Sequence, residues 1–154
     1  MLSKAQFLLI SVFSLSSLPA IAGDCPVNAQ GKLLSPIAPT SGHLISTEEL
    51  ASFSLKNEAP KLDGRRLRLR NIIFQPGGYV PLHSHDDRPA IARVTKGQLV
   101  EYQLNCTQPI IHKVGDIILE KKGVTHWVAN RSEKPAVLTV SDIVDDRIQK
   151  AQFK

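Results

Sequence analysis

The sequence predicts an all-β domain, because short β-forming runs follow one another closely and turn signals separate them. The turn signals are "PGG", "KG", "GD", "KKG" and "RSEKP". Many short strands at close spacing indicate a β-sandwich or a small barrel. The expected strands are "RLRLRNIIF", "YVPLH", "AIARVT", "QLVEYQL", "PIIHKV", "DIILE", "HWVAN" and "AVLTVSDIV".

The N-terminus has the pattern of a secretory signal peptide. Lys4 precedes the apolar run "FLLISVFSLSSL", and small residues follow at Ala20 and Ala22. This run is too short to cross a bilayer as a helix, and small residues suit a signal peptidase. We therefore expect residues 1–22 to be removed and the rest to be secreted or periplasmic, without stable membrane insertion.

An extended N-terminal arm is expected over residues 23–64, which are rich in Pro, Gly and Ser at their start. Within the arm, Ser46 and Glu49 in "STEELASF" form a capping-box pattern that predicts one short helix. The expected barrel covers residues 65–145. The polar tail, residues 146–154, suits either a surface helix or a frayed end.

The charge pattern gives little support to a nucleic-acid partner. The chain of 154 residues has a formal net charge of +5. Its dense basic run, "GRRLRLR", alternates Arg with Leu, which predicts a strand with one face toward water. The run is short and has no interleaved aromatic residues, so we expect no nucleic-acid binding.

Two cysteines, Cys25 and Cys106, remain after residue 22. An even number of cysteines in an exported protein favours a disulfide, although two unpaired thiols would fit the same sequence. Their separation does not match a metal-binding CxxC pair.

The most informative stretch is "PLHSHDD", in which His83 and His85 lie two residues apart. In a strand such residues point to the same face, about 7 Å apart along the backbone. Two ligands of one metal ion need this spacing, but two histidines on an exposed strand would look the same. The surrounding residues favour the interpretation that the two histidines bind one metal ion.

These residues resemble the cupin superfamily, whose first motif is written G(x)5HxH(x)3-4E(x)6G and whose second is written G(x)5PxG(x)2H(x)3N. The resemblance covers about residues 65–145 and implies a single cupin domain, a conical β-barrel of the jelly-roll type. It also implies that His83, His85 and His126 bind one divalent metal ion inside the barrel. Strand counting alone supports only the all-β class. The matching positions are Gly77, His83, His85 and Gly97 in the first motif, and Gly115, Gly123, His126 and Asn130 in the second, with Lys121 in place of proline.

One position departs from the motif, because Ala90 stands where the family has its glutamate ligand. If Lys96-Gly97 is a two-residue hairpin turn, Ala92 faces Glu101, and Glu101 points into the barrel. Glu101 is then a candidate fourth metal ligand or a general base. A register slip of one residue would instead expose it to water.

Other residues have weaker signals. Arg88 is a candidate for binding a substrate carboxylate, although a surface salt bridge with Asp86 or Asp87 explains it equally well. Trp127 is expected to point to the opposite face from His126 and to pack there. Asn130 is expected to support its loop. Outside the motifs, ordinary surface or partly buried histidines are expected at His43 and His112.

Our leading functional hypothesis is a metal-dependent, dioxygenase-like enzyme that acts on a small oxygenated or carboxylate-bearing molecule. Isomerase or lyase chemistry would need the same site. Iron is expected first, with Mn, Zn, Ni or Cu as alternatives. The second hypothesis is a binding or sensing cupin without turnover, which the loss of the glutamate favours; a site without metal is a third. Family analogy also suggests a homodimer.

Overall fold

The computed structural model describes residues 24–33, 36–59 and 61–148. The expected signal peptide and the end of the polar tail lie outside these residues. No helix in the described ranges is long and apolar enough to cross a membrane. The elements are a 3₁₀ turn η1 (Val27–Ala29) and the strands β1 (His43–Ser54), β2 (Arg65–Ser84), β3 (Ala90–Lys96), β4 (Gln98–Gln103), β5 (Ile110–Lys113), β6 (Ile117–Glu120), β7 (Thr125–Ala129) and β8 (Ala136–Asp145).

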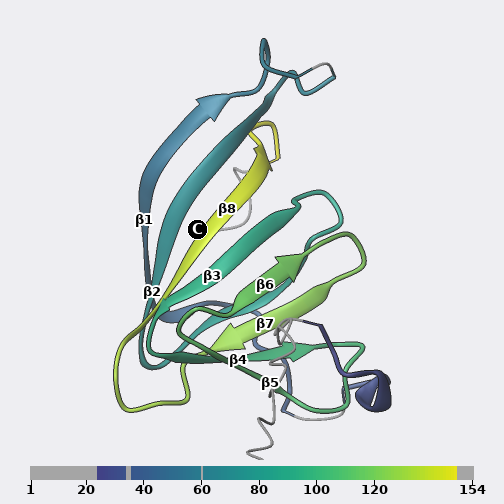
Figure 1. Ribbon diagram of the computed structural model, residues 1–154, viewed down its shortest axis with the longest axis vertical. Helices are drawn as coiled ribbons and strands as arrows, with labels where there is room; N and C mark the ends of the chain where they lie inside the picture. Colours follow the sequence, from purple (N-terminus) through teal and green to yellow (C-terminus); the bar gives the residue numbers. More distant parts are fainter. Residues whose placement is uncertain (1–23, 34–35, 60, 149–154) are drawn as a thin grey trace, which may run out of the picture.

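The strands form a nearly closed antiparallel β-barrel of the cupin type, which confirms the predicted fold class. Their order in the sheet is β5-β4-β7-β2-β8-β3-β6, and β1 pairs with β2. In Figure 1, β1, β2, β8, β3 and β6 follow one another across the molecule, and β7, β4 and β5 lie below them. Strand β2 joins the two groups, because its first half pairs with β8 and its end pairs with β7.

The short helix predicted at "STEELASF" is wrong, because these residues belong to β1. Residues from Ser46 to Ser54 pair with β2 in an antiparallel register. Glu49 also accepts a hydrogen bond from Ser52 and pairs with Arg66 on β2. The strand ladder and these contacts override a local capping pattern.

The structure also corrects two predicted turns. "PGG" does not separate two strands, because β2 runs through it, with Gly77 at a φ of 77° and its N–H donating to Asn130 O. A β3–β4 hairpin does not form. Instead β3 pairs with β6 and β8, while β4 pairs with β5 and β7.

The interior of the barrel is apolar at one end and charged at the other. Ile72 and Phe74 on β2 are buried in the apolar cluster with Val140 on β8. Arg68 and Arg70 lie on the same face of β2 and are only 8% and 5% exposed. The prediction that this strand turns its arginines to water is therefore wrong: the arginines point inward and Leu69 is exposed.

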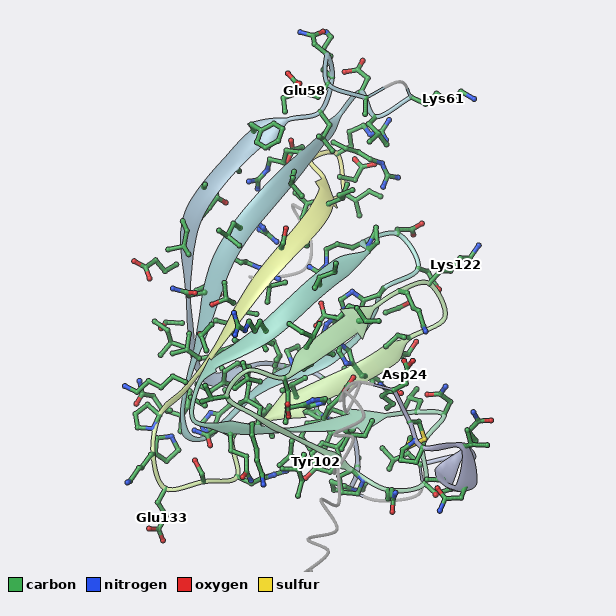
Figure 2. All side chains as sticks on the ribbon, viewed as in Figure 1. Asp24, Glu58, Lys61, Tyr102, Lys122 and Glu133 are labelled. Carbon is green, nitrogen blue, oxygen red and sulfur yellow. A yellow bond between two sulfur atoms is a disulfide. The ribbon has the colours of Figure 1, made fainter. Side chains whose placement is uncertain are left out.

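A second apolar cluster covers the outside of β4 and β7. Trp127 stacks on Tyr102 with ring centroids 4.0 Å apart, and Leu33 of the N-terminal arm packs in the same cluster. Figure 2 shows Tyr102 at this lower wall and the yellow sulfur atoms beside η1. Cys25 and Cys106 form a disulfide with a Cα–Cα distance of 5.6 Å, which confirms the pairing that the sequence favours. The arm is thereby held against the wall that contains His126.

Candidate metal centre

The three motif histidines meet inside the barrel, as the sequence predicts. His83 on β2 pairs directly with His126 on β7, so their side chains share one face. His85 follows β2, and its N–H donates to Val124 O just before β7. The ring centroids are 4.7 to 4.9 Å apart, and the candidate ligand atoms all lie within 4.8 Å of one another.

Each of these imidazoles has its Nδ1 atom occupied by an acceptor. His83 Nδ1 lies 2.8 Å from Pro81 O, and His85 Nδ1 lies 2.8 Å from Arg88 O. A carbonyl oxygen can only accept, so each Nδ1 carries the proton and donates it. In neutral imidazoles the Nε2 lone pairs are therefore free to bind a metal ion, and His85 Nε2 lies 3.0 Å from His126 Nε2.

Burial keeps two of the histidines neutral. Burial, with the neighbouring charge of His126, lowers the pKa of His83 to about 3 and that of His85 to about 4. Burial also opposes protonation of His126, but its hydrogen bond to Glu101 and the charges of Glu101 and Glu120 outweigh it and raise its pKa. A divalent metal ion requires unprotonated imidazole, so two of the three donors are ready to bind it and His126 would lose any proton on its Nε2 atom when the ion binds.

Glu101 lies on the Nδ1 side of His126. Its Oε1 accepts from His126 Nδ1 at 2.5 Å and from Gln103 Nε2 at 3.0 Å, and its Oε2 accepts from His112 Nε2 at 2.9 Å. Burial opposes its ionisation, yet these hydrogen bonds lower the pKa of Glu101 to about 2. Glu101 is fully buried. In this arrangement both carboxylate oxygens accept hydrogen bonds, and Glu101 holds the ring of His126 in place, as carboxylates do in many histidine metal sites. Its role as a metal ligand or general base stays a prediction.

The structure corrects the prediction for His112. It was expected to be an ordinary surface or partly buried histidine, but it is fully buried and donates to Glu101. The order His112, Glu101, His126 thus forms a continuous chain of hydrogen bonds that ends at the metal-facing Nε2 of His126.

A second buried carboxylate, Glu120, faces the Nε2 side of the histidines. Glu120 Oε2 lies 3.5 Å from His85 Nε2, and Glu120 Oε1 lies 3.8 Å from His126 Nε2. Burial raises the pKa of Glu120. Sequence reasoning missed this residue because "DIILE" is apolar on both faces, so its pattern does not indicate which way Glu120 points.

A cavity of about 410 Å³ opens beside the histidines. His83 and Glu120 line it, as do Arg70 and Arg88. Its remaining lining includes the apolar side chains Ile72, Val80, Val128, Leu138 and Val140.

Three arginines at or near this cavity share one acidic partner, Asp142. Arg68 takes both oxygens of Asp142, with distances of 3.0 and 2.7 Å. Arg70 Nη2 and Arg88 Nε lie farther from the same carboxylate, at 3.4 and 3.9 Å. Burial lowers the pKa of Arg70 to about 10 and also lowers that of Arg88. Arg70 Nε and Arg88 Nη1 are buried without a hydrogen-bond partner among the described residues.

The other predicted residues lie as follows. Arg88 contacts Asp142 rather than Asp86 or Asp87. Trp127 packs on the outer face, and Asn130 Nδ2 donates to Phe74, Gln75 and Lys134 carbonyls, so both structural roles are confirmed. His43 is exposed. Sequence reasoning missed Arg68, Arg70 and Asp142; the available signal was that Arg68 and Arg70 share their strand parity with Ile72 and Phe74.

A nearly closed antiparallel barrel with three inward histidines defines the class: a β-barrel with a candidate metal site. In a comparison with known families, residues 71–142 match the family described as the cupin domain.

Comparisons with individual proteins agree on the fold. The chain is 28% identical over 81 residues to auxin-binding protein ABP19b of Prunus persica, which covers 51% of this chain and 39% of that protein. A structure of oxalate oxidase in complex with the substrate analogue glycolate aligns with a TM-score of 0.51 and 23% identity, covering 75% of this chain and 61% of that one. The Schizosaccharomyces pombe Cnp3 cupin domain aligns with a TM-score of 0.51 and 10% identity, covering 70% and 69%. The chain thus spans less than two thirds of the first two proteins.

Proposed function

We propose that the protein is a metal-dependent enzyme acting on a small molecule that bears a carboxylate. The observation that carries this proposal is the convergence of three inward-facing histidines, of which His83 lines a cavity whose wall also contains Arg70 and Arg88. His83, His85 and His126 would hold the ion. A bound divalent metal supplies Lewis-acid or redox chemistry and leaves coordination positions for a ligand.

The buried arginines in the cavity wall support a carboxylate-bearing molecule. Asp142 is the shared partner of Arg68, Arg70 and Arg88, and Arg68 already engages both of its oxygens. Guanidinium groups prefer carboxylates because their N–H groups match two oxygens at once. Arg70 and Arg88 would bind the carboxylate of the small molecule, while the apolar lining would contact the rest of it.

Among the reactions open to such a site, we propose oxidation by dioxygen, with iron as the first metal to test and Mn, Zn, Ni and Cu as alternatives. The structural similarity to oxalate oxidase is compatible with this choice, but it supports the fold alone. Isomerase or lyase chemistry needs the same histidines. The assay below distinguishes these reaction types from oxidation by measuring oxygen consumption and product formation.

Binding without turnover is the second candidate function. Ala90 favours it, since the family's glutamate ligand is missing at this position. The named auxin-binding relative is a further reason to test small-molecule binding. We also propose that the protein is exported, which the Cys25–Cys106 disulfide supports, and that a homodimer should be tested by light scattering.

The test measures binding and turnover together on the metal-loaded protein. Small carboxylic acids and their neutral amides are screened by thermal shift, and the acids that bind are then assayed for oxygen consumption and product formation. We expect acids but not amides to raise the Tm of wild type. Arg70→Gln and Arg88→Gln should lose this shift, whereas Arg93→Gln, at an exposed position on β3, should keep it. Equal shifts for acids and amides would contradict the substrate class, and binding without product would favour the second function.

A further inference from the structure

The sheet surrounds Ala90 with two carboxylates. Ala90 on β3 pairs with Glu120 on β6 and, on its other side, with Asp142 on β8. Directly paired residues point to the same face. All three are buried, at 9%, 5% and 1% exposure. The methyl group of Ala90 therefore leaves space between two acidic side chains at the position where the resemblance predicts a ligand.

These two carboxylates have different surroundings. Asp142 is bound by Arg68 through both oxygens and is approached by Arg70. For Glu120, the contacts found among the described residues are the Nε2 atoms of His85 and His126, at 3.5 and 3.8 Å, and no hydrogen bond within that part of the chain satisfies its oxygens. Glu120 also lines the cavity beside His83.

The histidines cannot supply these donors while they are neutral. His85 Nδ1 donates to Arg88 O, and His126 Nδ1 donates to Glu101, so both Nε2 atoms present lone pairs. Two lone-pair nitrogens 3.0 Å apart and the two Glu120 oxygens thus face one another. These four atoms point toward one another, which is the arrangement of ligands around a single cation.

The distances fit ligands of one ion. Nitrogen and oxygen ligands lie about 2.0–2.2 Å from a metal such as zinc, so neighbouring ligands are about 3.0 to 3.5 Å apart. The His85–His126 and His85–Glu120 distances, 3.0 and 3.5 Å, lie in this range, and the His126–Glu120 distance of 3.8 Å is slightly longer.

We propose that Glu120 is the fourth metal ligand, supplied across the sheet from β6 in place of a glutamate at position 90. The inference rests on the histidine metal site of the proposed function. It gives the site three neutral nitrogens and one anionic oxygen, a set that suits Mn²⁺, Fe²⁺ or Zn²⁺. It also leaves Arg70 Nε and Arg88 Nη1, which have no hydrogen-bond partner among the described residues, available to an incoming carboxylate.

The experiment measures the affinity of the full purified chain for Mn²⁺ and Zn²⁺ by chelator competition. Glu120→Gln and Glu120→Ala are compared with wild type and with the matched control Glu133→Gln, an exposed glutamate in the β7–β8 loop. We expect Glu133→Gln to bind like wild type and both Glu120 variants to bind at least tenfold more weakly. Visible spectra of the Co²⁺-loaded proteins should differ from wild type for Glu120→Gln and not for Glu133→Gln.

A relocation variant keeps the test decisive if a Glu120 variant folds poorly. Ala90→Glu combined with Glu120→Ala returns the carboxylate to the family's position, and we expect it to recover much of the lost affinity. Wild-type affinity and an unchanged Co²⁺ spectrum in Glu120→Gln, together with loss of metal in His85→Ala, would overturn the role of Glu120 and leave the histidine site intact. Absence of metal binding in wild type would overturn both the inference and the proposed function.

Discussion

The two buried glutamates of the barrel lie on opposite sides of His126 and have opposite surroundings. On the β4–β7 wall, Glu101 accepts hydrogen bonds from three side chains and is ionised at neutral pH because its pKa lies near 2. On the β3–β6 wall, Glu120 faces two imidazole lone pairs, and burial raises its pKa.

The difference in hydrogen-bond donors gives the two buried carboxylates different roles. A carboxylate with all its donors in place fixes the ring it binds and stabilises the fold. A carboxylate without donors destabilises the metal-free protein and becomes favourable only when a cation arrives. Glu101, on the β4–β7 wall, therefore orients His126. Glu120, on the β3–β6 wall, is the carboxylate that we propose binds the ion.

The largest expected effect is the difference in metal-free stability between a variant that lacks Glu101 and one that lacks Glu120. Glu101→Ala leaves His126 Nδ1, His112 Nε2 and Gln103 without their acceptor, and loss of one partner from a buried charged pair costs about 3–5 kcal/mol. Glu120→Ala should either lower the free energy of unfolding of the metal-free protein by no more than about 1 kcal/mol or raise it. Urea unfolding in the presence of a chelator measures both, and equal destabilisation by the two variants would contradict the comparison.

Metal addition should stabilise the wild type through mass action. At a free metal concentration 100 times Kd, the free energy of unfolding should rise by about 2.7 kcal/mol. In Glu120→Gln, a tenfold weaker affinity would reduce this gain by about 1.4 kcal/mol at the same metal concentration. Calorimetric unfolding with and without Mn²⁺ checks this, and an identical gain in the two proteins would argue against a bound Glu120.

The two carboxylates should also give opposite pH dependences in the metal-free protein. The folded-state pKa of Glu101 is about 2, below its ordinary value of 4.5, so its stabilisation is present above pH 4.5 and is lost as the pH falls toward 2. The pKa of Glu120 is raised, so its contribution is most favourable below pH 4.5 and is lost as the pH rises through the folded-state pKa.

Unfolding of wild type, Glu101→Gln and Glu120→Gln between about pH 2 and pH 7 measures these contributions as differences. The advantage of wild type over Glu101→Gln should shrink as the pH falls. Relative to Glu120→Gln, wild type should gain stability over the same change. Parallel curves for all three proteins would show that neither glutamate titrates differently in the folded state.

The smallest effect is expected at the far end of the hydrogen-bond chain. His112→Gln keeps a donor for Glu101 and does not touch the metal-facing atoms, so we expect a loss of about 1 kcal/mol of stability and less than a tenfold change in Mn²⁺ affinity. A change as large as that of Glu101→Ala would mean that His112, rather than Glu101, determines the orientation of His126.

The histidine site could be predicted from the sequence because its signal is local in spacing. His83 and His85 share a strand face, and the motif that contains His126 lies at a fixed distance from them. The carboxylates were harder to assign, because their positions depend on which strands pair. The expected β3–β4 hairpin predicts Glu101 as the carboxylate next to the histidines, whereas the actual β3–β6 pairing places Glu120 beside Ala90.

Two further errors have a similar cause. "STEELASF" has a helix-capping pattern, but pairing with β2 makes it a strand. "RLRLR" alternates like a solvated strand, but Asp142 on the neighbouring strand β8 provides a buried partner for its arginines. Long-range pairing, which the local pattern does not encode, decided both outcomes.

The central claim is that His83, His85 and His126 bind one metal ion, and metal content per chain tests it most directly. Elemental analysis should compare wild type, His85→Ala and the control His43→Ala, at an exposed histidine outside the site. We predict about one equivalent of divalent metal in wild type and His43→Ala, and almost none in His85→Ala. A wild type that remains empty after reconstitution, or a His85→Ala variant that retains a full equivalent, would contradict the account.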